Sequence, residues 1–397
     1  MTHAVADLSP SRIDHRVVDL PAGTLQFVVE ACHGKLDDLI GFAARANPRR
    51  AFLFLSKVLG KHYPARPAAM VAVHQHLASL VPATQGPVVF VGMAETATGL
   101  GQGVFESWRR LHSYLPALYL QTTRYRIESA PCLTFEESHS HAPRVFLHLP
   151  QDAGAQALLR SATQVVLIDD ELSTGNTFVN LTKVLQTVMS ALSAVHVATI
   201  CDFMGEARRG DIALRMGRPC TVGAAVSGHW QFESNGQAIV PGAAAQCGDG
   251  REVRLDDSGY GRLGRIHPVR LPLALVERIA GERVSGPTLV LGTGEFMHAA
   301  FVLARALDAS GVDVVVQATT RSPILLWGDV SERLNVQDPY GEGVPNYLYN
   351  VRPEQYRRVL ICHETEPNAA LQALAEQLAG RLIQFKPNDY AEEIPVR

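Results

Sequence analysis

Two aspartates followed by a hydroxyl-rich turn form the stretch of this sequence best suited to chemistry. Four apolar residues, Val165–Ile168, lead into Asp169 and Asp170, and a turn of serine, threonine, glycine and asparagine follows. Carboxylates repel phosphate, whereas the backbone N–H groups and hydroxyls of such a turn attract it when a helix begins there. A sugar phosphate satisfies both halves, with its hydroxyls at the acids and its phosphate in the turn. The candidate phosphate-binding residues are Ser173, Thr174, Gly175, Asn176 and Thr177.

The same acids suit a second task. Adjacent carboxylates stabilise positive charge that develops on a sugar as a bond breaks, and they also hold water-coordinated Mg²⁺. Asp169 and Asp170 are therefore our candidate catalytic residues and our candidate ligands for Mg²⁺, the expected cofactor, held through water or through oxygens of the bound ligand. Glu171, the third acid of the run, has no role that follows from the sequence.

A strand and a helix must position these residues at one edge of a sheet. Short apolar runs alternate with helical patterns, which is typical of an α/β fold with parallel strands. The acids then lie at the carboxyl end of a strand, where open α/β sheets bind ligands. We expect helices over Gly103–Leu111 and Thr177–Leu192, and strands over Val88–Gly92, Ala117–Gln121, Val145–Leu149, Val165–Ile168 and Val195–Cys201.

The amino-acid composition of the chain changes near its middle. Glycine becomes frequent and apolar runs shorten between residues 220 and 268, and a second α/β pattern follows. We predict a first domain over residues 1–220, a short β-rich insert or connector over 221–270 and a smaller α/β domain over 271–397. The strands expected in the last domain are Thr288–Leu291, Val312–Gln317 and Arg358–Cys362.

A weak internal repeat links the two α/β segments. Val88–Gly99 and Thr288–Ala299 both read as a strand, a glycine, two residues, a glutamate and a helix. A Thr-Thr-Arg sequence follows each, ending at Arg124 and at Arg321. The second segment lacks the aspartate pair and the hydroxyl-rich turn, so a true repeat would make it a degenerate partner. Chance similarity between βαβ units is the alternative.

Composition narrows the class of protein. The 397 residues, 47% hydrophobic and 19% charged, suffice for two or three folded domains. The net charge of −3 gives no indication of nucleic acid or membrane binding, and no apolar run is long enough for a membrane span. We read no signal peptide at the N-terminus. The six cysteines form no CxxC pair, so we expect reduced thiols in a cytoplasmic protein.

The segment from Val165 to Thr177 resembles the phosphoribosyl-pyrophosphate (PRPP) motif of type I phosphoribosyltransferases. That motif has four apolar residues, two acids, two mostly apolar positions and a Ser/Thr-rich turn ending in Gly-x-Thr. Asp169 and Asp170 match the acids. Glu171 stands where an apolar residue is usual, and Asn176 where glycine is common. The alternative is an unrelated nucleotide-binding turn with acids by chance.

Four further stretches narrow the resemblance. They are similar to orphan phosphoribosyltransferases associated with tellurium-resistance and stress gene clusters, which carry a C-terminal TRSP domain. The stretches are Arg50–Pro64, Phe135–Ala142, Thr320–Pro323 and Glu342–Val351. The resemblance implies a type I phosphoribosyltransferase-like parallel sheet flanked by helices, plus the second, smaller α/β domain. It also implies transfer of a 5-phosphoribosyl group from PRPP to an unidentified nitrogenous acceptor, with release of pyrophosphate, in a specialised or stress-linked nucleotide-like pathway.

An enzyme of this class must hold the departing pyrophosphate. The loop after the first strand is well placed, and glycine permits close backbone approach. A plain structural turn is the alternative, and Glu95 could coordinate Mg²⁺ through water or cap the helix. Lys57 and Lys61, spaced i and i+4, would share one face of a helix, either solvated or turned towards the ligand. The candidate pyrophosphate-binding residues are Gly92, Met93, Ala94, Glu95, Thr96, Lys57 and Lys61.

A polar segment after the second strand, from Arg124 to about Ala142, stands where the family places its mobile catalytic loop. Basic residues there could neutralise pyrophosphate on closure. Three interpretations stay open: a solvated loop, a closing loop that supplies an acid or base, or a structural metal site with an unspecific HxH pattern. The candidate residues are Arg124, Arg126, Glu137, His139 and His141.

The last domain either contacts the acceptor or only rigidifies the core. Its candidate acceptor contacts are Glu295, Arg321 and Tyr340. Two rival functions remain: a catalytically silent module that senses PRPP or a nucleotide, and reverse, pyrophosphorolytic cleavage of a nucleotide-like substrate. The expected partners are PRPP and a small-molecule acceptor, without nucleic acid or membrane, and a homodimer is left open.

Overall fold

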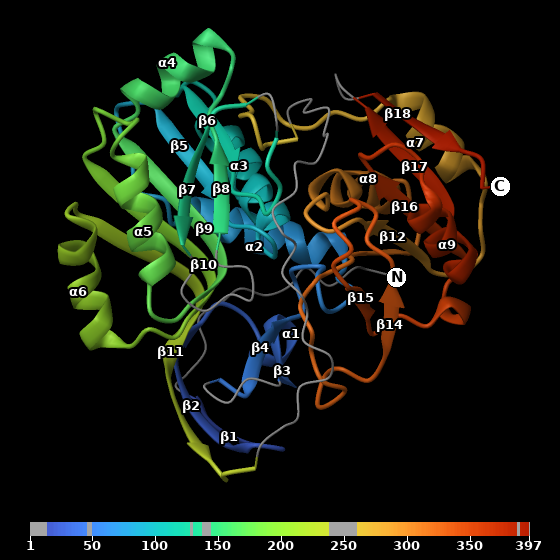
Figure 1. Cartoon of the computed structure of the whole chain (residues 1–397), viewed down its shortest axis with the longest axis horizontal. Helices are drawn as coiled ribbons and strands as arrows, with labels where there is room; N and C mark the ends of the chain where they lie inside the picture. Colours follow the sequence, from blue (N-terminus) through green and yellow to red (C-terminus); the bar gives the residue numbers. More distant parts are fainter. Residues whose placement is uncertain are drawn as a thin grey trace.

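A seven-stranded sheet organises the first half of the molecule in the computed structural model (Figure 1). Its strand order is β1-β2-β11-β10-β9-β5-β6. Five strands run parallel, and an antiparallel pair extends the sheet at one edge. The parallel strands are β5 (Val88–Gly92), β6 (Ala117–Gln121), β9 (Gln164–Leu172), β10 (Ala194–Asp202) and β11 (Cys220–Ser234), and the pair is β1 (Asp14–Leu20) and β2 (Gly23–Cys32).

The structure describes residues 14–45, 50–127, 130–136, 144–237, 260–386 and 390–396. Within these ranges, no helix is both long and apolar enough to cross a membrane. Glu137, His139 and His141, which we expected in a mobile loop, lie outside the described residues.

Helices cover both faces of this sheet because its central strands are apolar on both sides. Every residue of β5 and β6 is buried. α2 and α3 lie on one face and α5 and α6 on the other (Figure 1), while α4 packs beside β5 and β6. These helices are α2 (Pro67–Ser79), α3 (Thr98–Leu111), α4 (Ala153–Ser161), α5 (Asn176–Leu185) and α6 (Glu206–Met216).

A second, five-stranded sheet organises the C-terminal half in the order β13-β12-β16-β17-β18. Its first four strands are parallel and β18 is antiparallel. The strands are β12 (Thr288–Gly292), β13 (Val314–Ala318), β16 (Arg358–His363), β17 (Arg381–Lys386) and β18 (Tyr390–Ile394). The helices are α7 (Leu273–Gly281), α8 (His298–Ala309) and α9 (Ala369–Leu378), with a 3₁₀ turn at Pro353–Gln355. α8 packs against α3 and α2, which joins the two halves.

Three antiparallel hairpins complete the described structure. They are β3 (Ile40–Ala44) with β4 (Phe52–Ser56), β7 (Cys132–Glu136) with β8 (Arg144–His148), and β14 (Arg333–Val336) with β15 (Asn346–Tyr349). A short helix, α1 (Leu36–Leu39), precedes β3.

The α/β class and the mostly parallel sheet confirm the sequence prediction, but three local expectations differ. The strand expected over residues 145–149 pairs with β7 in a hairpin instead of joining the parallel sheet. The helix expected to reach Leu192 ends at Leu185 in α5. Residues 221–234, expected in an insert, belong to β11, between β10 and β2. The domain boundaries stay a prediction.

Candidate functional site

The acidic pair lies at the carboxyl end of β9, at the sheet edge where the loop after β5 also begins. The register of the two strands places Gly92 beside Ile168. The Asp170 N–H donates to Oδ1 of Asp169 at 2.9 Å, and the Thr96 hydroxyl donates to Oδ1 of Asp170 at 2.7 Å. The structure thus brings together a residue from each of the two loops predicted to share one ligand.

The predicted phosphate turn joins β9 to α5. Gly175 precedes the helix with φ of +71°, a left-handed conformation that favours glycine. A Cβ at this position would also meet Ile212 Cδ1 at 2.9 Å. The Asn176 N–H donates to the Thr174 hydroxyl at 3.4 Å. The turn therefore leads directly into a helix N-terminus, the arrangement that attracts a phosphate.

Arg215, from α6, supports this turn and was missing from the sequence prediction. Its guanidinium donates to the Thr174 carbonyl at 3.0 Å and to the Asn176 side chain. A groove of about 280 Å³ lies beside the same helix turn, lined by Asn176, Val179, Asn180, Lys183 and Arg215. Nothing in the sequence near residue 175 indicates this contact, because α6 returns to the turn only in the folded chain.

Glu171, unexplained by the sequence, forms an ion pair with Arg50. Arg50 lies just before β4, and its guanidinium carbon is 5.1 Å from the centre of the Phe52 ring. Both charged side chains are partly buried, with 24% and 12% of Arg50 and Glu171 exposed. The third acid is therefore engaged by the segment that leads into β4.

Replacing Glu171 by glutamine should leave turnover within about fivefold of the wild type and lower stability by roughly 1 kcal/mol, since a partly exposed ion pair contributes little. Steady-state rates and thermal unfolding check both values. Arg50→Gln is the matched control, because it removes the other partner of the same pair. A loss of activity as large as that caused by changing Asp170 would contradict this assignment.

The loop after β5 is held closely by its neighbours. Gly92 has no room for a side chain, because a Cβ would lie 2.5 Å from the Tyr119 hydroxyl. The N–H of Ala94 donates to the Thr122 hydroxyl at 2.7 Å, and the N–H of Met93 donates to the Ile168 carbonyl at 2.9 Å. The peptide bond between Ala94 and Glu95 is cis. This loop is anchored to β6 and β9, next to the acidic pair.

Glu95 is bound by the protein itself. Its carboxylate is 2.9 Å from the Lys61 ammonium and accepts the Arg321 N–H at 3.2 Å. Burial alone would raise the pKa of Glu95, but the charges of Lys61 and Arg321 outweigh it and lower the pKa to about 2. Glu95 therefore stays ionised and connects the loop after β5 with the C-terminal half.

Lys57 and Lys61 do not lie on one face of a helix, in contrast to the arrangement considered from their spacing. Residues 57–63 form bends, and Gly60 has φ of +68°, which interrupts any helix. Lys57 pairs with Asp329 at 3.1 Å. Lys61 is fully buried and donates to the Gly294 carbonyl at 2.6 Å in addition to its contact with Glu95. Their predicted contact with pyrophosphate stays a prediction.

His62 is a polar residue of the site that the sequence indicated only by its position after Lys61. Its side chain is buried, and its Nε2 has no hydrogen-bond partner within the described part of the chain. Burial lowers the pKa of His62 to about 4, against the opposing charge of Asp170 and with the help of Arg45. The imidazole is therefore neutral at pH 7, close to Asp170 and Glu95.

The segment expected as a mobile loop begins with a fixed turn. The Arg124 N–H and the Thr123 hydroxyl donate to the two carboxylate oxygens of Glu295, at 2.7 and 2.6 Å. Arg126 is exposed. Further along, residues 132–136 form β7. Part of the expected loop is therefore a hairpin strand, and its start is held from the C-terminal half.

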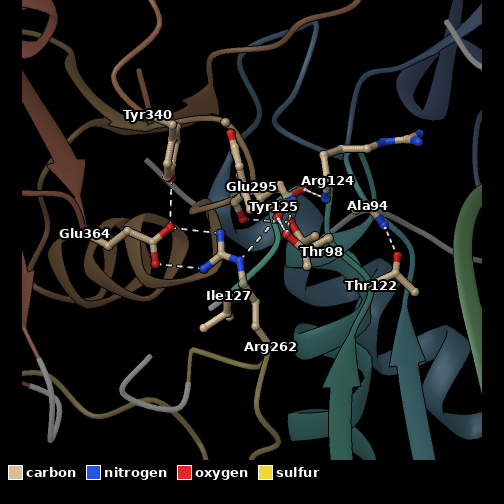
Figure 2. Close-up of polar contacts among 12 residues, drawn as sticks. Ala94, Thr98, Thr122, Arg124, Tyr125, Ile127, Arg262, Glu295, Tyr340 and Glu364 are labelled. Carbon is tan, nitrogen blue, oxygen red and sulfur yellow. Dashed lines mark hydrogen bonds and ion pairs between the residues drawn. The ribbon is translucent and has the colours of Figure 1, made fainter. Parts of the chain in front are cut away.

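The three candidate acceptor contacts belong to a second polar cluster, in the C-terminal half. Figure 2 shows Glu295 and Tyr340 in this cluster. Buried Arg262 donates both terminal nitrogens to Glu364, at 2.8 and 2.9 Å, and lies 3.3 Å from Glu295. The Tyr340 hydroxyl is 2.8 Å from Glu364, and its ring stacks on Tyr125. The Arg321 guanidinium donates to the Tyr125 hydroxyl and pairs with Glu342. Arg262 and Glu364 were not predicted.

Across the described ranges, no cluster of three or more histidine, cysteine, aspartate or glutamate side chains is arranged to hold a metal ion. The sequence prediction of Mg²⁺ at Asp169 and Asp170 involves two carboxylates only. Such a site depends on water or ligand oxygens to complete the coordination shell.

Comparison with protein families matches two adjoining parts of the chain. Residues 39–229 match a family described as phosphoribosyl transferase, and residues 270–378 match the TRSP domain that follows it at the C-terminus. This order confirms the resemblance found in the motifs. No curated protein matches the sequence.

Three solved structures that match part of this chain share 12–13% of its sequence. Adenine phosphoribosyltransferase from Rhodothermus marinus DSM 4252 is 13% identical; the match covers 48% of this chain and 95% of the enzyme, with a TM-score of 0.30. The Trypanosoma brucei enzyme of the same name is 12% identical; the match covers 53% of this chain and 86% of the enzyme, with a TM-score of 0.33. Orotate phosphoribosyltransferase from Mycobacterium tuberculosis H37Rv is 12% identical; the match covers 47% of this chain and 89% of that enzyme, with a TM-score of 0.26.

Proposed function

We propose that this chain, which belongs to the family in which a phosphoribosyl transferase domain is followed by a TRSP domain, transfers the 5-phosphoribosyl group of PRPP to a nitrogenous acceptor and releases pyrophosphate. One observation carries the proposal. Thr96, from the loop after β5, donates to Asp170 at the end of β9, so the loop proposed for pyrophosphate and the acids proposed for ribose form one site. The hydroxyl-rich turn continues directly from those acids.

In this proposal the substrate lies along the carboxyl edge of the sheet. Its 5-phosphate occupies the turn of residues 173–177, where the N-terminus of α5 contributes favourable backbone dipoles. The ribose hydroxyls donate to Asp169 and Asp170. The pyrophosphate lies towards residues 92–96. The three parts of the substrate are thus placed in the order of the chain, because the acids of β9 come after the loop that follows β5 and before the turn at α5.

The acidic pair fits Mg²⁺ by its chemistry. Magnesium prefers oxygen ligands, keeps several waters and commonly combines one or two carboxylates with substrate phosphates. Asp169 and Asp170 would hold the ion, which would neutralise charge on the pyrophosphate as it leaves. Lys61 cannot serve as a freely mobile cation here, since it is buried against Glu95 and Gly294.

The protein groups perform two tasks in the transfer. The acceptor nitrogen forms a bond to C1 of the ribose as the bond from C1 to the pyrophosphate oxygen breaks, and the pyrophosphate takes the electron pair. Asp169 and Asp170 stabilise the positive charge on the sugar ring in the transition state. The Thr96 hydroxyl orients Asp170. Neutral His62 lies near Asp170, and no described group occupies its Nε2.

Among the expected acceptor contacts, Arg321 contacts the loop after β5 directly, because its N–H donates to Glu95. Glu295 and Tyr340, like the Arg321 guanidinium, bind groups of the protein.

The test is a PRPP-dependent assay with candidate acceptors. We expect release of pyrophosphate when the protein, PRPP and Mg²⁺ are incubated with a panel of nitrogenous bases and with fractions of a cell extract. Replacing PRPP by ribose 5-phosphate is the control, since it lacks the leaving group. Tight binding of PRPP with no pyrophosphate release in any fraction would contradict the proposal and favour a sensing module.

A further inference from the structure

The two halves of the molecule repeat one arrangement. In the first unit, residues 60–202, the strand order is β6-β5-β9-β10, and in the second unit, residues 260–386, it is β13-β12-β16-β17. In the first unit, α2 precedes β5, α3 follows β5, and the hairpin β7–β8 comes after β6. In the second unit, α7 precedes β12, α8 follows β12, and the hairpin β14–β15 comes after β13. The weak sequence repeat therefore corresponds to a repeated fold.

Equivalent positions also form equivalent hydrogen bonds. In the first unit, the Ala94 N–H donates to the Thr122 hydroxyl at 2.7 Å, and in the second unit the Gly294 N–H donates to the Thr319 hydroxyl at 2.8 Å. A second matched pair joins each hairpin to the segment before it: Ile127 N–H to His148 Nε2 at 3.0 Å, and Ile324 N–H to the Tyr349 hydroxyl at 2.7 Å. Matches of this detail go beyond a shared strand order.

The two units contact each other reciprocally. Arg124 of the first unit donates its N–H to Glu295 of the second, and Arg321 of the second donates its N–H to Glu95 of the first. Backbone pairs show the same exchange: Arg265 bonds to Tyr119 in β6, and Ala65 bonds to Val316 in β13. When residue i contacts j and the equivalent of j contacts the equivalent of i, the interface is isologous, as between the subunits of a symmetric dimer.

The units differ at the ends of two equivalent strands. Asp170 at the end of β9 and Glu364 at the end of β16 occupy matching places in register. In the first unit, Lys61 contacts Glu95, while Asp170 accepts from Thr96. In the second unit, Arg262 contacts Glu295 and also holds Glu364 with both terminal nitrogens. The matched backbone pairs of Ala65 and Arg265 place Arg262 at the position of His62. The forked arginine thus contacts both acids of the second unit.

Tyr340 adds to this closure. Its hydroxyl lies 2.8 Å from Glu364 and its ring stacks on Tyr125 of the first unit, with centres 4.4 Å apart (Figure 2). Arg262 and Glu364 have side-chain exposures of 2% and 5%. Every charged group at this place has a partner within the protein, so a negatively charged ligand would have to displace the ion pairs.

We propose that the second unit is a copy of the first whose equivalent site is occupied by its own ion pairs, so that it binds no PRPP. Its role is structural: Glu295 of the second unit positions the start of the first unit's loop after β6. Glu295 is a positioning residue, since it binds Arg124 and Thr123 and not the reacting atoms. The statement about PRPP rests on the proposed function, whereas the role of Glu295 does not.

Hydrogen exchange of the intact chain tests the reciprocal contacts. Glu295→Gln keeps the size of the side chain but replaces a charged acceptor by a neutral one, which weakens its hydrogen bonds. We expect the Arg124 amide to exchange about fivefold faster in this variant. The mirror variant Glu95→Gln should accelerate the Arg321 amide instead, and each variant should leave the other amide unchanged. Unchanged exchange at Arg124 in Glu295→Gln would overturn the positioning role.

Titration with PRPP and Mg²⁺ tests the closed site. Calorimetry of the wild type should give one PRPP bound per chain. Asp170→Asn should weaken this binding, whereas Glu364→Gln, its counterpart in the second unit, should change the Kd by less than about twofold. A second PRPP per chain, or a binding loss confined to Glu364→Gln, would overturn the proposal. Failure of the wild type to bind any PRPP would overturn the proposed function instead, and the exchange experiment would still decide the role of Glu295.

Discussion

Replacing Asp169 and Asp170 together by asparagine should lower PRPP turnover by about a thousandfold or more. Removal of a single preorganised group that stabilises transition-state charge commonly costs 10²–10³ in rate, and here two carboxylates at the end of β9 are changed at once. Asparagine keeps the size of each side chain, and both residues are only partly buried. We therefore expect an unchanged fold by circular dichroism and a thermal midpoint close to that of the wild type.

The matched control uses another pair of adjacent aspartates. Asp37 and Asp38 are exposed on α1, so changing both to asparagine removes the same charge from another segment of the chain. This control should keep wild-type turnover in the pyrophosphate-release assay. Activity within tenfold of the wild type in the Asp169 and Asp170 variant would contradict the assigned site.

Replacing Lys61 by methionine should have the largest effect on stability, about 3–5 kcal/mol, because it removes the ion-pair partner of the buried Glu95 carboxylate. The Lys61 side chain is fully buried, whereas 13% of the Glu95 side chain is exposed. Lys57→Met is the matched control. Lys57 forms a partly exposed pair with Asp329, so its loss should cost less than about 1 kcal/mol. Chemical denaturation of the three proteins measures the difference.

The effect of Lys61→Met should depend on pH. In the wild type, the charges of Lys61 and Arg321 lower the pKa of Glu95 to about 2 against the effect of burial. The ion pair therefore contributes fully above the pKa of an unfolded glutamate, about 4.3, and its contribution is lost as the pH falls towards 2. In the variant, protonation of Glu95 relieves the buried charge.

The stability deficit of Lys61→Met should consequently shrink between pH 7 and pH 4. The double variant Lys61→Met with Glu95→Gln should recover much of the deficit at pH 7, since no buried charge then lacks a partner. A deficit that is constant with pH, or a double variant less stable than Lys61→Met alone, would show that the ion pair does not stabilise the native state.

Local chemistry explains which parts of the site could be predicted. The acids and the hydroxyl-rich turn follow one another within a single β-strand, turn and helix, so the order of residue types is sufficient to predict that local structure. The strands over residues 88–92 and 117–121 were also predictable because buried parallel strands are apolar throughout. The spacing of Lys57 and Lys61 would have placed them on one face only in a helix, and the left-handed conformation of Gly60 excludes a helix there.

Contacts between distant segments could not be predicted. Glu171 looked unexplained because its partner, Arg50, is separated from it by more than a hundred residues. Arg215 reaches the phosphate turn from a later helix. The internal repeat was visible in the sequence, but only the folded chain brings Glu95 to Arg321 and Glu295 to Arg124. Spacing along the chain contains no information on such reciprocal contacts.

The structure of the chain crystallised with PRPP and Mg²⁺ tests the central claim most directly. We predict the 5-phosphate in the turn of residues 173–177, the ribose hydroxyls at Asp169 and Asp170, the pyrophosphate beside residues 92–96, and Arg262 still bound to Glu364. A 5-phosphate bound elsewhere, or PRPP between Glu295 and Glu364 with Arg262 displaced, would contradict the account.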